Sequence, residues 1–296
     1  MEHLNEETRN FLLSSPDDNT RIEFIQKDTW IAYPVAKDIL QQMDDMLNHP
    51  RNYRMKSLLV IGTTDNGKSS IFHRFREQHP YNVTGSFEVN VPAVFLQLPY
   101  NVDERGFINS IMQAMSQPIR LNGRTDNSLK ELIQALQDLQ VRLLVMDETQ
   151  HITNVNYKKQ RLFLGLIKYV STEAKLPMIA FGTEEAQNAF ASDPQLDNRF
   201  KTVAIPRWKA NDDILRLLVS FEKKIPLKKA SALHDEELAL QIFSRTNGTI
   251  GEISQVLKLS AIEAVKSGEE RITKKIVEKI KFDSAKDRSS KEIKNV

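Results

Sequence analysis

The sequence of 296 residues contains no cysteine, so disulfide bonds and thiolate metal sites are excluded. Its six histidines are scattered and lack the paired spacing of a zinc site on a helix. No run approaches the roughly eighteen apolar residues that a membrane-spanning helix needs. The first residues are acidic and polar, unlike the basic and then apolar start of a signal peptide. We therefore expect a cytoplasmic protein with no membrane partner.

Charge of one sign is not in excess either. Lys and Arg number 41 against 39 for Asp and Glu, which leaves a net charge of +2. With such a balance, only the local distribution of charge can indicate a nucleic-acid partner. Hydrophobic residues make up 40% and charged residues 27%, which is an ordinary globular composition. The length suffices for one large α/β domain and a smaller one.

Short apolar runs separated by helical stretches occupy the middle of the chain. The runs typical of buried strands are 56–62, 91–98, 141–146 and 177–182, with a short fifth at 203–205. Helical spacing covers 31–47, 68–78, 106–115, 128–140 and 158–172. Strands that alternate with helices predict an α/β fold with a central parallel sheet, covered on both faces.

From Pro206 onward the pattern is entirely helical, over 212–224, 235–246, 250–267 and 273–281. The last residues are charged and poor in apolar groups, as in a flexible tail. We therefore expect an N-terminal arm with short helical pieces (1–30), an α/β nucleotide-binding domain (31–206), a small all-helical lid domain (207–281) and a charged tail (282–296).

Residues 62–69 match the phosphate-binding pattern G-x-x-x-x-G-K-[ST] and stand between a predicted strand and a predicted helix. In this context the backbone N–H groups wrap phosphates, Lys68 reaches the β- and γ-phosphates, and Ser69 binds Mg²⁺. The alternative is a glycine turn that only joins the strand to the helix. The predicted ATP contacts are Gly62, Thr63, Thr64, Asp65, Asn66, Gly67, Lys68, Ser69 and Ser70.

The strand predicted at 141–146 is followed directly by Asp147 and Glu148, the arrangement of a Walker B motif. Asp147 is expected to hold the magnesium ion together with Ser69. Glu148 is expected to orient and deprotonate the attacking water. A pair of carboxylates that merely ends a strand is the alternative.

Two further residues fit a hydrolytic site. Thr183 follows the fourth strand, where a polar side chain can bind the γ-phosphate or the water, although it can equally act as the N-cap of a helix. Arg199 follows a helix and precedes the last strand, where oligomeric ATPases present an arginine finger to the neighbouring subunit. An ordinary surface ion pair is the alternative for Arg199.

Several segments together resemble a TniB-type transposition ATPase, a relative of TnsC in the AAA+ superfamily. They span roughly residues 21 to 280. The matching segments are 30–34 (WIAYP), 48–51 (NHPR), 65–68 (DNGK), 147–151 (DETQH), 181–183 (FGT), 196–200 (LDNRF), 206–208 (PRW), 218–222 (LVSFE) and 248–253 (GTIGEI).

The resemblance implies an AAA+ P-loop domain with a helical lid, which assembles with ATP as a homo-oligomeric ring or filament on double-stranded DNA. It also implies a link between a TniQ-like targeting protein and a DDE-type transposase. One residue departs from the general AAA+ pattern, because Glu252 stands where many relatives carry the sensor-2 arginine. Slow, regulatory hydrolysis is therefore expected, with Arg245 or backbone contacts from the lid as substitutes.

Contacts with adenine and DNA are expected at less specific positions. Ile31, Tyr33, Ile250 and Gly251 are the candidates for lining the adenine, although Tyr33 can also be a core anchor. In AAA+ relatives, the loops after the second strand usually point into the central pore. The candidates there for DNA phosphates are Arg105, Arg120 and Arg124, with scattered solvent-facing arginines as the alternative.

Two other functions stay open. A replication-initiator or clamp-loader-like AAA+ ATPase would share the same motifs. A nucleotide switch that serves as a scaffold without hydrolysis is the second, and the complete pair of carboxylates at Asp147 and Glu148 argues against it.

Overall fold

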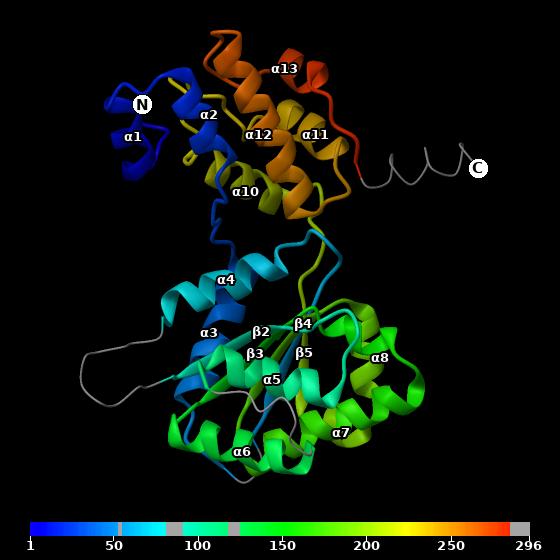
Figure 1. Cartoon of the computed structure of the whole chain (residues 1–296). Coiled ribbons are helices and arrows are strands. Elements are labelled where there is room, and N and C mark those ends of the chain that lie inside the picture. The colour runs from blue at the N-terminus through cyan, green and yellow to red at the C-terminus, as the bar shows by residue number, and fades with distance from the viewer. Residues whose placement is uncertain (53–54, 81–90, 118–124, 285–296) are drawn as a thin grey trace. The chain divides into compact units, whose positions relative to one another are not determined.

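The computed structural model describes residues 1–52, 55–80, 91–117 and 125–284 (Figure 1). The chain divides into two compact units. We call residues 34–64 and 68–205 the sheet unit, and residues 1–33, 65–67 and those from Pro206 onward the helical unit. The four functional domains expected from the sequence stay a prediction.

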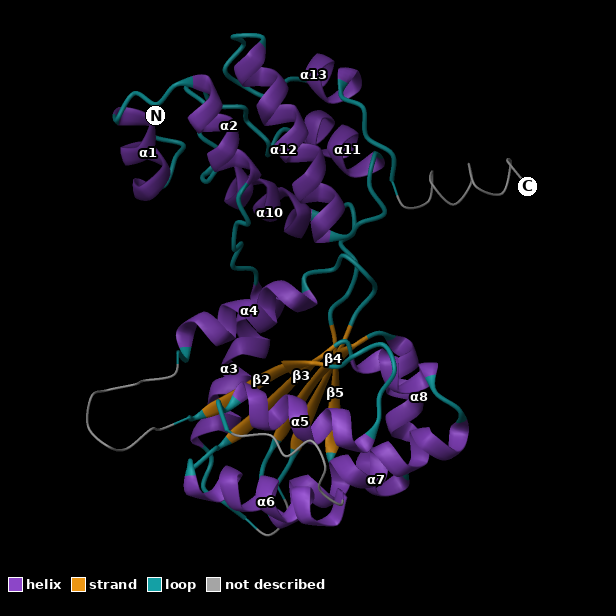
Figure 2. Cartoon of the chain, viewed as in Figure 1, coloured by secondary structure: helices purple, strands orange, loops and turns teal. Residues whose placement is uncertain are grey.

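The sheet unit is built on five parallel strands in the order β2-β3-β4-β1-β5 (Figure 2). The strands are β1 (Ser57–Ile61), β2 (Ala93–Gln97), β3 (Leu143–Asp147), β4 (Met178–Gly182) and β5 (Phe200–Ala204). Every residue of β3 and β4 is buried, as expected for strands covered on both faces. The predicted α/β class with a central parallel sheet is confirmed.

Helices connect and cover these strands, and apolar side chains from the helices between residues 104 and 197 form one core with the sheet. Because β1 leads into α4 and β3 leads into a 3₁₀ helix, two polar loops emerge at the same carboxyl edge of the sheet. The helices are α3 (Pro34–Asn48), α4 (Lys68–Gln78), α5 (Glu104–Ala114), α6 (Thr125–Asp138), the 3₁₀ helix η1 (Thr149–Asn154), α7 (Tyr157–Glu173), α8 (Glu184–Ala191) and α9 (Pro194–Asp197).

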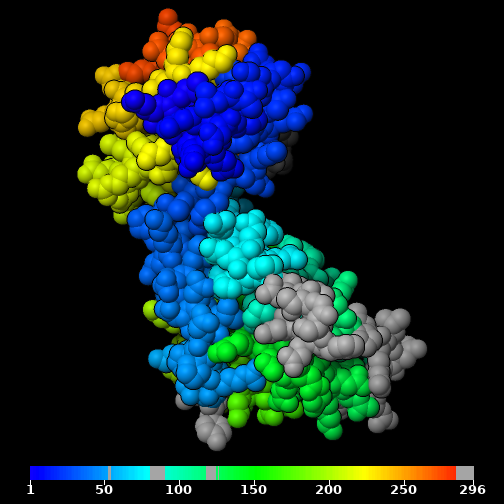
Figure 3. Space-filling view, turned by 90° about the vertical axis from the view of Figure 1, so that its left-hand side faces the viewer, coloured from blue at the N-terminus to red at the C-terminus, as the bar shows by residue number. Residues whose placement is uncertain are grey.

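The helical unit has its own core, to which the N-terminal segment contributes Ile25 and Ile31. Helix α2 packs against α12, and Figure 3 shows the N-terminal segment, in blue, against the yellow-to-orange C-terminal helices. The helices of this unit are α1 (Glu6–Leu13), α2 (Asp18–Gln26), α10 (Asp212–Glu222), α11 (Glu236–Ser244), α12 (Ile250–Lys266) and α13 (Lys274–Lys279).

Element boundaries differ from the predicted ones where local chemistry competes with periodicity. The helix expected from residue 31 begins at Pro34, because the proline ring disfavours the helical conformation at the residue before it. Strand β5 begins at Phe200, three residues before the apolar run predicted it, since Lys201 and Thr202 on this edge strand are exposed. Within the described ranges, none of the helices combines the length and apolar character required to traverse a bilayer.

Candidate nucleotide-binding site

The phosphate-binding loop leaves β1 at Gly62 and enters α4 at Lys68, as the motif predicts. Lys68 is 8% exposed, and its Nζ donates to the carbonyl oxygens of Gly62 and Thr63 at 2.8 and 2.9 Å. Both acceptors are neutral, so an anionic phosphate oxygen would be a stronger partner for the ammonium group. Ser69 and Ser70 are exposed on the first turn of α4.

The tip of the loop, residues 65–67, belongs to the helical unit. Gly67 has a φ of +85°, and a Cβ there would lie 3.1 Å from Ile250 Cγ2 and 3.3 Å from Tyr33 Oη. The Gly251 N–H donates to the Asp65 carbonyl oxygen at 3.0 Å. Asn66 lies at the same tip, where its Nδ2 donates to the Pro206 carbonyl oxygen at 3.1 Å. The structure thus brings the loop tip together with three of the candidate adenine residues.

Those adenine candidates already have roles in packing. Ile31 lies in the apolar core of the helical unit. The Tyr33 ring packs edge-on against Trp208, with ring centroids 5.3 Å apart, and burial raises the pKa of Tyr33 to about 12. The contact with Trp208 favours the core-anchor alternative for Tyr33. Adenine binding by these residues stays a prediction.

Asp147 ends β3 beside the start of α4. It is 5% exposed, and its Oδ2 accepts from the Ser69 hydroxyl at 3.1 Å. Burial raises the pKa of Asp147, and the neighbouring Glu148 charge adds to this, while bonds from Glu148 N–H and Ser69 and the charge of Lys68 oppose it. The buried carboxylate is therefore poorly solvated, and a bound cation would stabilise its charged form.

This pair fits magnesium better than a metal that needs many protein ligands. Mg²⁺ prefers oxygen ligands and usually keeps several waters, so one carboxylate and one hydroxyl are sufficient when phosphates complete the shell. Across the described parts of the chain, no group of three or more His, Cys, Asp or Glu side chains could hold a metal ion. The donor set of Ser69 and Asp147 is the one that fits the implied cation.

Glu148 has a left-handed backbone, with φ 58° and ψ 36°, and stands directly before η1. Its Oε2 accepts from Gln150 Nε2 and lies 3.9 Å from His151 Nε2. Thr149, which lies between Glu148 and Gln150 in the sequence, is fully buried and donates to the Phe181 carbonyl oxygen at 2.8 Å. Sequence reasoning assigned no role to these three neighbours of Glu148. The available signal was the polar run that follows the two carboxylates.

Thr183 occupies the N-cap position of α8, but its side chain makes no capping bond to the helix backbone. Its hydroxyl donates to the Glu185 carboxylate, and this bond lowers the pKa of Glu185. Gly182, just before it, is tightly packed, since a Cβ there would lie 2.5 Å from Thr149 Oγ1 and 2.6 Å from Ala186 Cβ. The sensor-1 role of Thr183 stays a prediction.

Arg199 lies at the amino-terminal end of the strands, whereas the phosphate-binding loop lies at their carboxyl end. Its carbonyl oxygen accepts from the Ser57 N–H at 2.9 Å, so it stands at the start of β1, about 13 Å of strand away from the loop. The Arg199 guanidinium donates to the Thr172 hydroxyl at 2.8 Å. This arrangement does not bring Arg199 to its own loop.

The remaining sequence-predicted residues divide between described and undescribed parts. Arg105 is exposed on the first turn of α5, whereas Arg120 and Arg124 lie outside the described residues. Glu252 is buried and accepts from the Asn247 N–H at 2.6 Å, which makes it a structural residue of the loop before α12.

Arg245, one of the two substitutes expected for a sensor-2 arginine, is directed elsewhere. Its guanidinium donates to the carbonyl oxygens of Val277 and Ile280 near the end of α13. The other substitute, a backbone contact from the lid, corresponds to the bond between Gly251 and Asp65.

The parallel sheet of order β2-β3-β4-β1-β5, the phosphate-binding loop after β1 and the carboxylates after β3 define a P-loop domain of the AAA+ class. The model of the family described as bacterial TniB protein matches residues 21–210, more than half of the chain. The chain belongs to the TniB family, as the resemblance implied.

Solved structures with the same fold include two ORC proteins and a Cdc6p protein. Aeropyrum pernix ORC2 has a TM-score of 0.60 and 13% identity, over 86% of this chain and 69% of that one. Cdc6p of Pyrobaculum aerophilum has a TM-score of 0.59 and 18% identity, over 87% and 68% of the two chains. Aeropyrum pernix ORC1 has a TM-score of 0.56 and 13% identity, over 92% and 69%. A comparison with functionally curated proteins gave no match.

Proposed function

We propose that this chain binds ATP with Mg²⁺ and hydrolyses it slowly, as a regulator of DNA transposition. The observation that carries the proposal is the contact between the Ser69 hydroxyl and the buried Asp147 carboxylate, next to the buried ammonium group of Lys68. Phosphate, cation and water ligands are thus supplied by one edge of one sheet. The structure of Aeropyrum pernix ORC2, which has the same fold, was solved as ADPNP and ADP complexes.

Each residue has a distinct part in the proposed hydrolysis. Loop N–H groups and Lys68 bind the phosphates, and Ser69 with Asp147 would hold Mg²⁺, which when bound neutralises charge on the β- and γ-phosphates. Glu148 accepts a proton of the water as the water oxygen bonds to the γ-phosphorus and the bond from that phosphorus to the leaving ADP oxygen breaks. Thr183 binds the γ-phosphate or the water.

Arg199 supplies charge to a neighbouring subunit, which requires a homo-oligomer. Its position at the amino-terminal end of the strands supports this, because about 13 Å of strand β1 separates it from its own loop. Mixing Arg199→Ala with Lys68→Ala chains tests the assignment. Each variant alone is expected to be inactive, whereas mixed oligomers pair an intact loop with an intact arginine and recover hydrolysis. Confirmed co-assembly without recovery would contradict action in trans.

The DNA part of the proposal rests on family membership and on structural likeness. We propose that the oligomer assembles on double-stranded DNA and connects a TniQ-like targeting protein to a DDE-type transposase, in the cytoplasm. A structure of similar fold, Aeropyrum pernix ORC1, was solved in complex with DNA. The proposed phosphate contacts are Arg105, Arg120 and Arg124.

A replication-initiator function is the second candidate, and the fold shared with the Aeropyrum pernix ORC2 and ORC1 proteins over 86 and 92% of this chain favours it. DNA binding separates the two functions. A transposition regulator that forms filaments should bind random duplexes in proportion to their length, whereas an initiator should form one complex on a defined sequence. Electron microscopy and fluorescence anisotropy with ATP, ADP or no nucleotide would distinguish these outcomes.

A salt series in the same anisotropy experiment tests the DNA residues. Each lost phosphate contact should lower the slope of log affinity against log salt by about 0.9. Arg105→Ala should show this change with unaltered nucleotide binding, because Arg105 lies on α5 and not on the phosphate-binding loop. An unchanged slope would remove Arg105 from the DNA site.

A further inference from the structure

The carboxylate of Glu148 is restrained on one oxygen only. Gln150 Nε2 donates to Oε2, and His151 Nε2 lies 3.9 Å from the same atom. The Glu148 side chain is 30% exposed, so packing alone does not hold it in one rotamer. Gln150 therefore restrains the carboxylate through Oε2, with His151 beside it, and Oε1 is left available to a reactant.

The two neighbours are themselves anchored. His151 Nδ1 lies 3.0 Å from the Leu98 carbonyl oxygen, and because a carbonyl can only accept, this nitrogen carries the proton. That bond orients the ring with Nε2 toward Glu148, where it attracts the carboxylate only when the imidazole carries a second proton. The start of η1 is held to β4 by the bond from Thr149 to the Phe181 carbonyl oxygen. Gln150 and His151 thus project from a turn that contacts both β4 and the residue after β2.

Glu148 needs such support because its own geometry does not hold it. Its left-handed backbone is uncommon outside glycine, and a glutamate side chain has several rotamers of similar energy. A base that must meet a water in one direction loses rate when it samples others. We propose that Gln150 and His151 are positioning residues that hold Glu148 for water activation, an inference that rests on the proposed hydrolysis.

The expected size of the effect follows from the bond to a charged group. Such a bond contributes about 1.5 kcal/mol at the low end, which corresponds to roughly tenfold in rate. Gln150→Ala should therefore lower kcat about tenfold and leave the Kd for ATP unchanged, since neither Gln150 nor Glu148 belongs to the phosphate-binding loop. Gln150→Met should be equally impaired, because methionine keeps the volume and lacks the amide.

Two variants of His151 separate positioning from simple support of the turn. His151→Asn keeps a donor near the Leu98 carbonyl oxygen but cannot reach Glu148, whereas His151→Gln places an amide toward Glu148. If His151 positions Glu148, the kcat of His151→Gln should be closer to the wild-type value than the kcat of His151→Asn. A purely structural role predicts the reverse order, together with a lower midpoint of thermal unfolding.

The experiment measures phosphate release, ATP affinity and thermal unfolding for the full chain and these variants, with Gln134→Ala on the exposed face of α6 as the control. A wild-type rate in Gln150→Met, a higher rate in Gln150→Ala, or better rescue by Asn than by Gln at His151 would overturn positioning. Absence of hydrolysis by the wild-type chain would instead overturn the proposed function, and this inference with it.

Discussion

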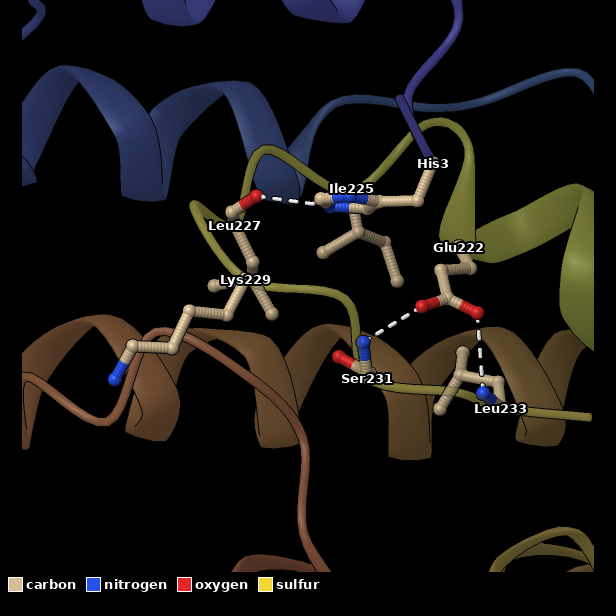
Figure 4. Close-up of a pocket in the computed structure, with 7 residues that line it drawn as sticks. All are labelled: His3, Glu222, Ile225, Leu227, Lys229, Ser231 and Leu233. Carbon is tan, nitrogen blue, oxygen red and sulfur yellow. Dashed lines mark hydrogen bonds between the residues drawn. The ribbon is translucent and has the colours of Figure 1, made fainter. Parts of the chain in front are cut away.

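The two units use their buried charged groups differently. In the helical unit, the Glu222 carboxylate accepts from the backbone N–H groups of Ser231, Ala232 and Leu233 at 2.6 to 3.0 Å. Figure 4 shows the bonds from Ser231 and Leu233. Arg21, 1% exposed, forms a two-bond pair with Glu270 at 2.8 and 2.5 Å. Apart from Arg21 Nε, the polar side-chain atoms of these groups have partners within the fold, and they hold loops and the N-terminal segment in place.

In the sheet unit, Lys68 and Asp147 at the carboxyl edge form hydrogen bonds with neutral groups. Lys68 donates to two carbonyl oxygens, Asp147 accepts from a hydroxyl and a backbone N–H, and the opposite charges of the two side chains attract each other. Burying a charge is costly unless it is well paired, so groups with exchangeable partners are poised for a charged ligand. The comparison favours a folding role for the charges of the helical unit, and we propose a binding role for those of the sheet unit.

Loss of Arg21 should give the largest effect on folding. Arg21→Met leaves Glu270, only 12% exposed, without its main partner, and breaking such a buried pair costs about 3 to 5 kcal/mol. Arg271→Met, on an exposed pair with Glu269, should change the free energy of unfolding by less than about 0.5 kcal/mol. Urea titrations of both variants measure the difference. Equal stabilities would show that the pair is not a folding element.

Lys68→Ala should affect ligand binding and spare stability. Lys68 is expected to donate charge-assisted hydrogen bonds to the β- and γ-phosphates of ATP, and the variant lacks both. At about 1.5 kcal/mol each, their loss should weaken ATP affinity by roughly 100-fold. Lys56→Ala, an exposed lysine just before β1, is the matched control and should bind normally. Isothermal titration calorimetry gives both affinities. A large loss of stability in Lys68→Ala without loss of binding would reverse the comparison between the units.

Glu222→Gln should have a smaller effect on folding. The amide has one acceptor oxygen, so it leaves at least one of the N–H groups of Ser231, Ala232 and Leu233 poorly satisfied. The expected cost is about 1 to 3 kcal/mol. Glu236→Gln, on the exposed first turn of α11, is the control. Thermal unfolding of the two variants side by side decides the point, and identical midpoints would count against it.

The smallest effect expected is a dependence of stability on acid pH. Burial raises the pKa of Glu270, but the bonds from Arg21 and the Lys228 N–H outweigh it and lower the pKa below the ordinary 4.5. A lowered folded-state pKa gives stability that is present above pH 4.5 and is lost as the pH falls through the folded value. Glu270→Gln should lose this component, so its stability should fall less between pH 5 and 3 (about the range of an ordinary carboxyl group).

Local sequence patterns located much of the candidate nucleotide site. Residues 62–69 follow one another, so the loop could be recognised from spacing alone, and Asp147 and Glu148 end an unbroken apolar run. Contacts between distant segments left no such signal. Arg21 and Glu270 stand 249 positions apart, and Arg199 meets Thr172 across 27 positions.

The structure also shows why some expectations about secondary structure failed. The start of β5 could not be located from hydropathy, because this edge strand exposes Lys201 and Thr202. The turn after Glu148 follows a left-handed residue that has no glycine to mark it. Both are cases in which tertiary context, and not the local pattern, decides the conformation.

Phosphate release by wild type and Glu148→Gln, measured beside ATP affinity, tests the central claim most directly. Glutamine keeps the shape of Glu148 but cannot accept the proton of the attacking water. The account predicts that Glu148→Gln binds ATP as tightly as wild type and loses nearly all hydrolysis. Equal hydrolysis by the two proteins would contradict it.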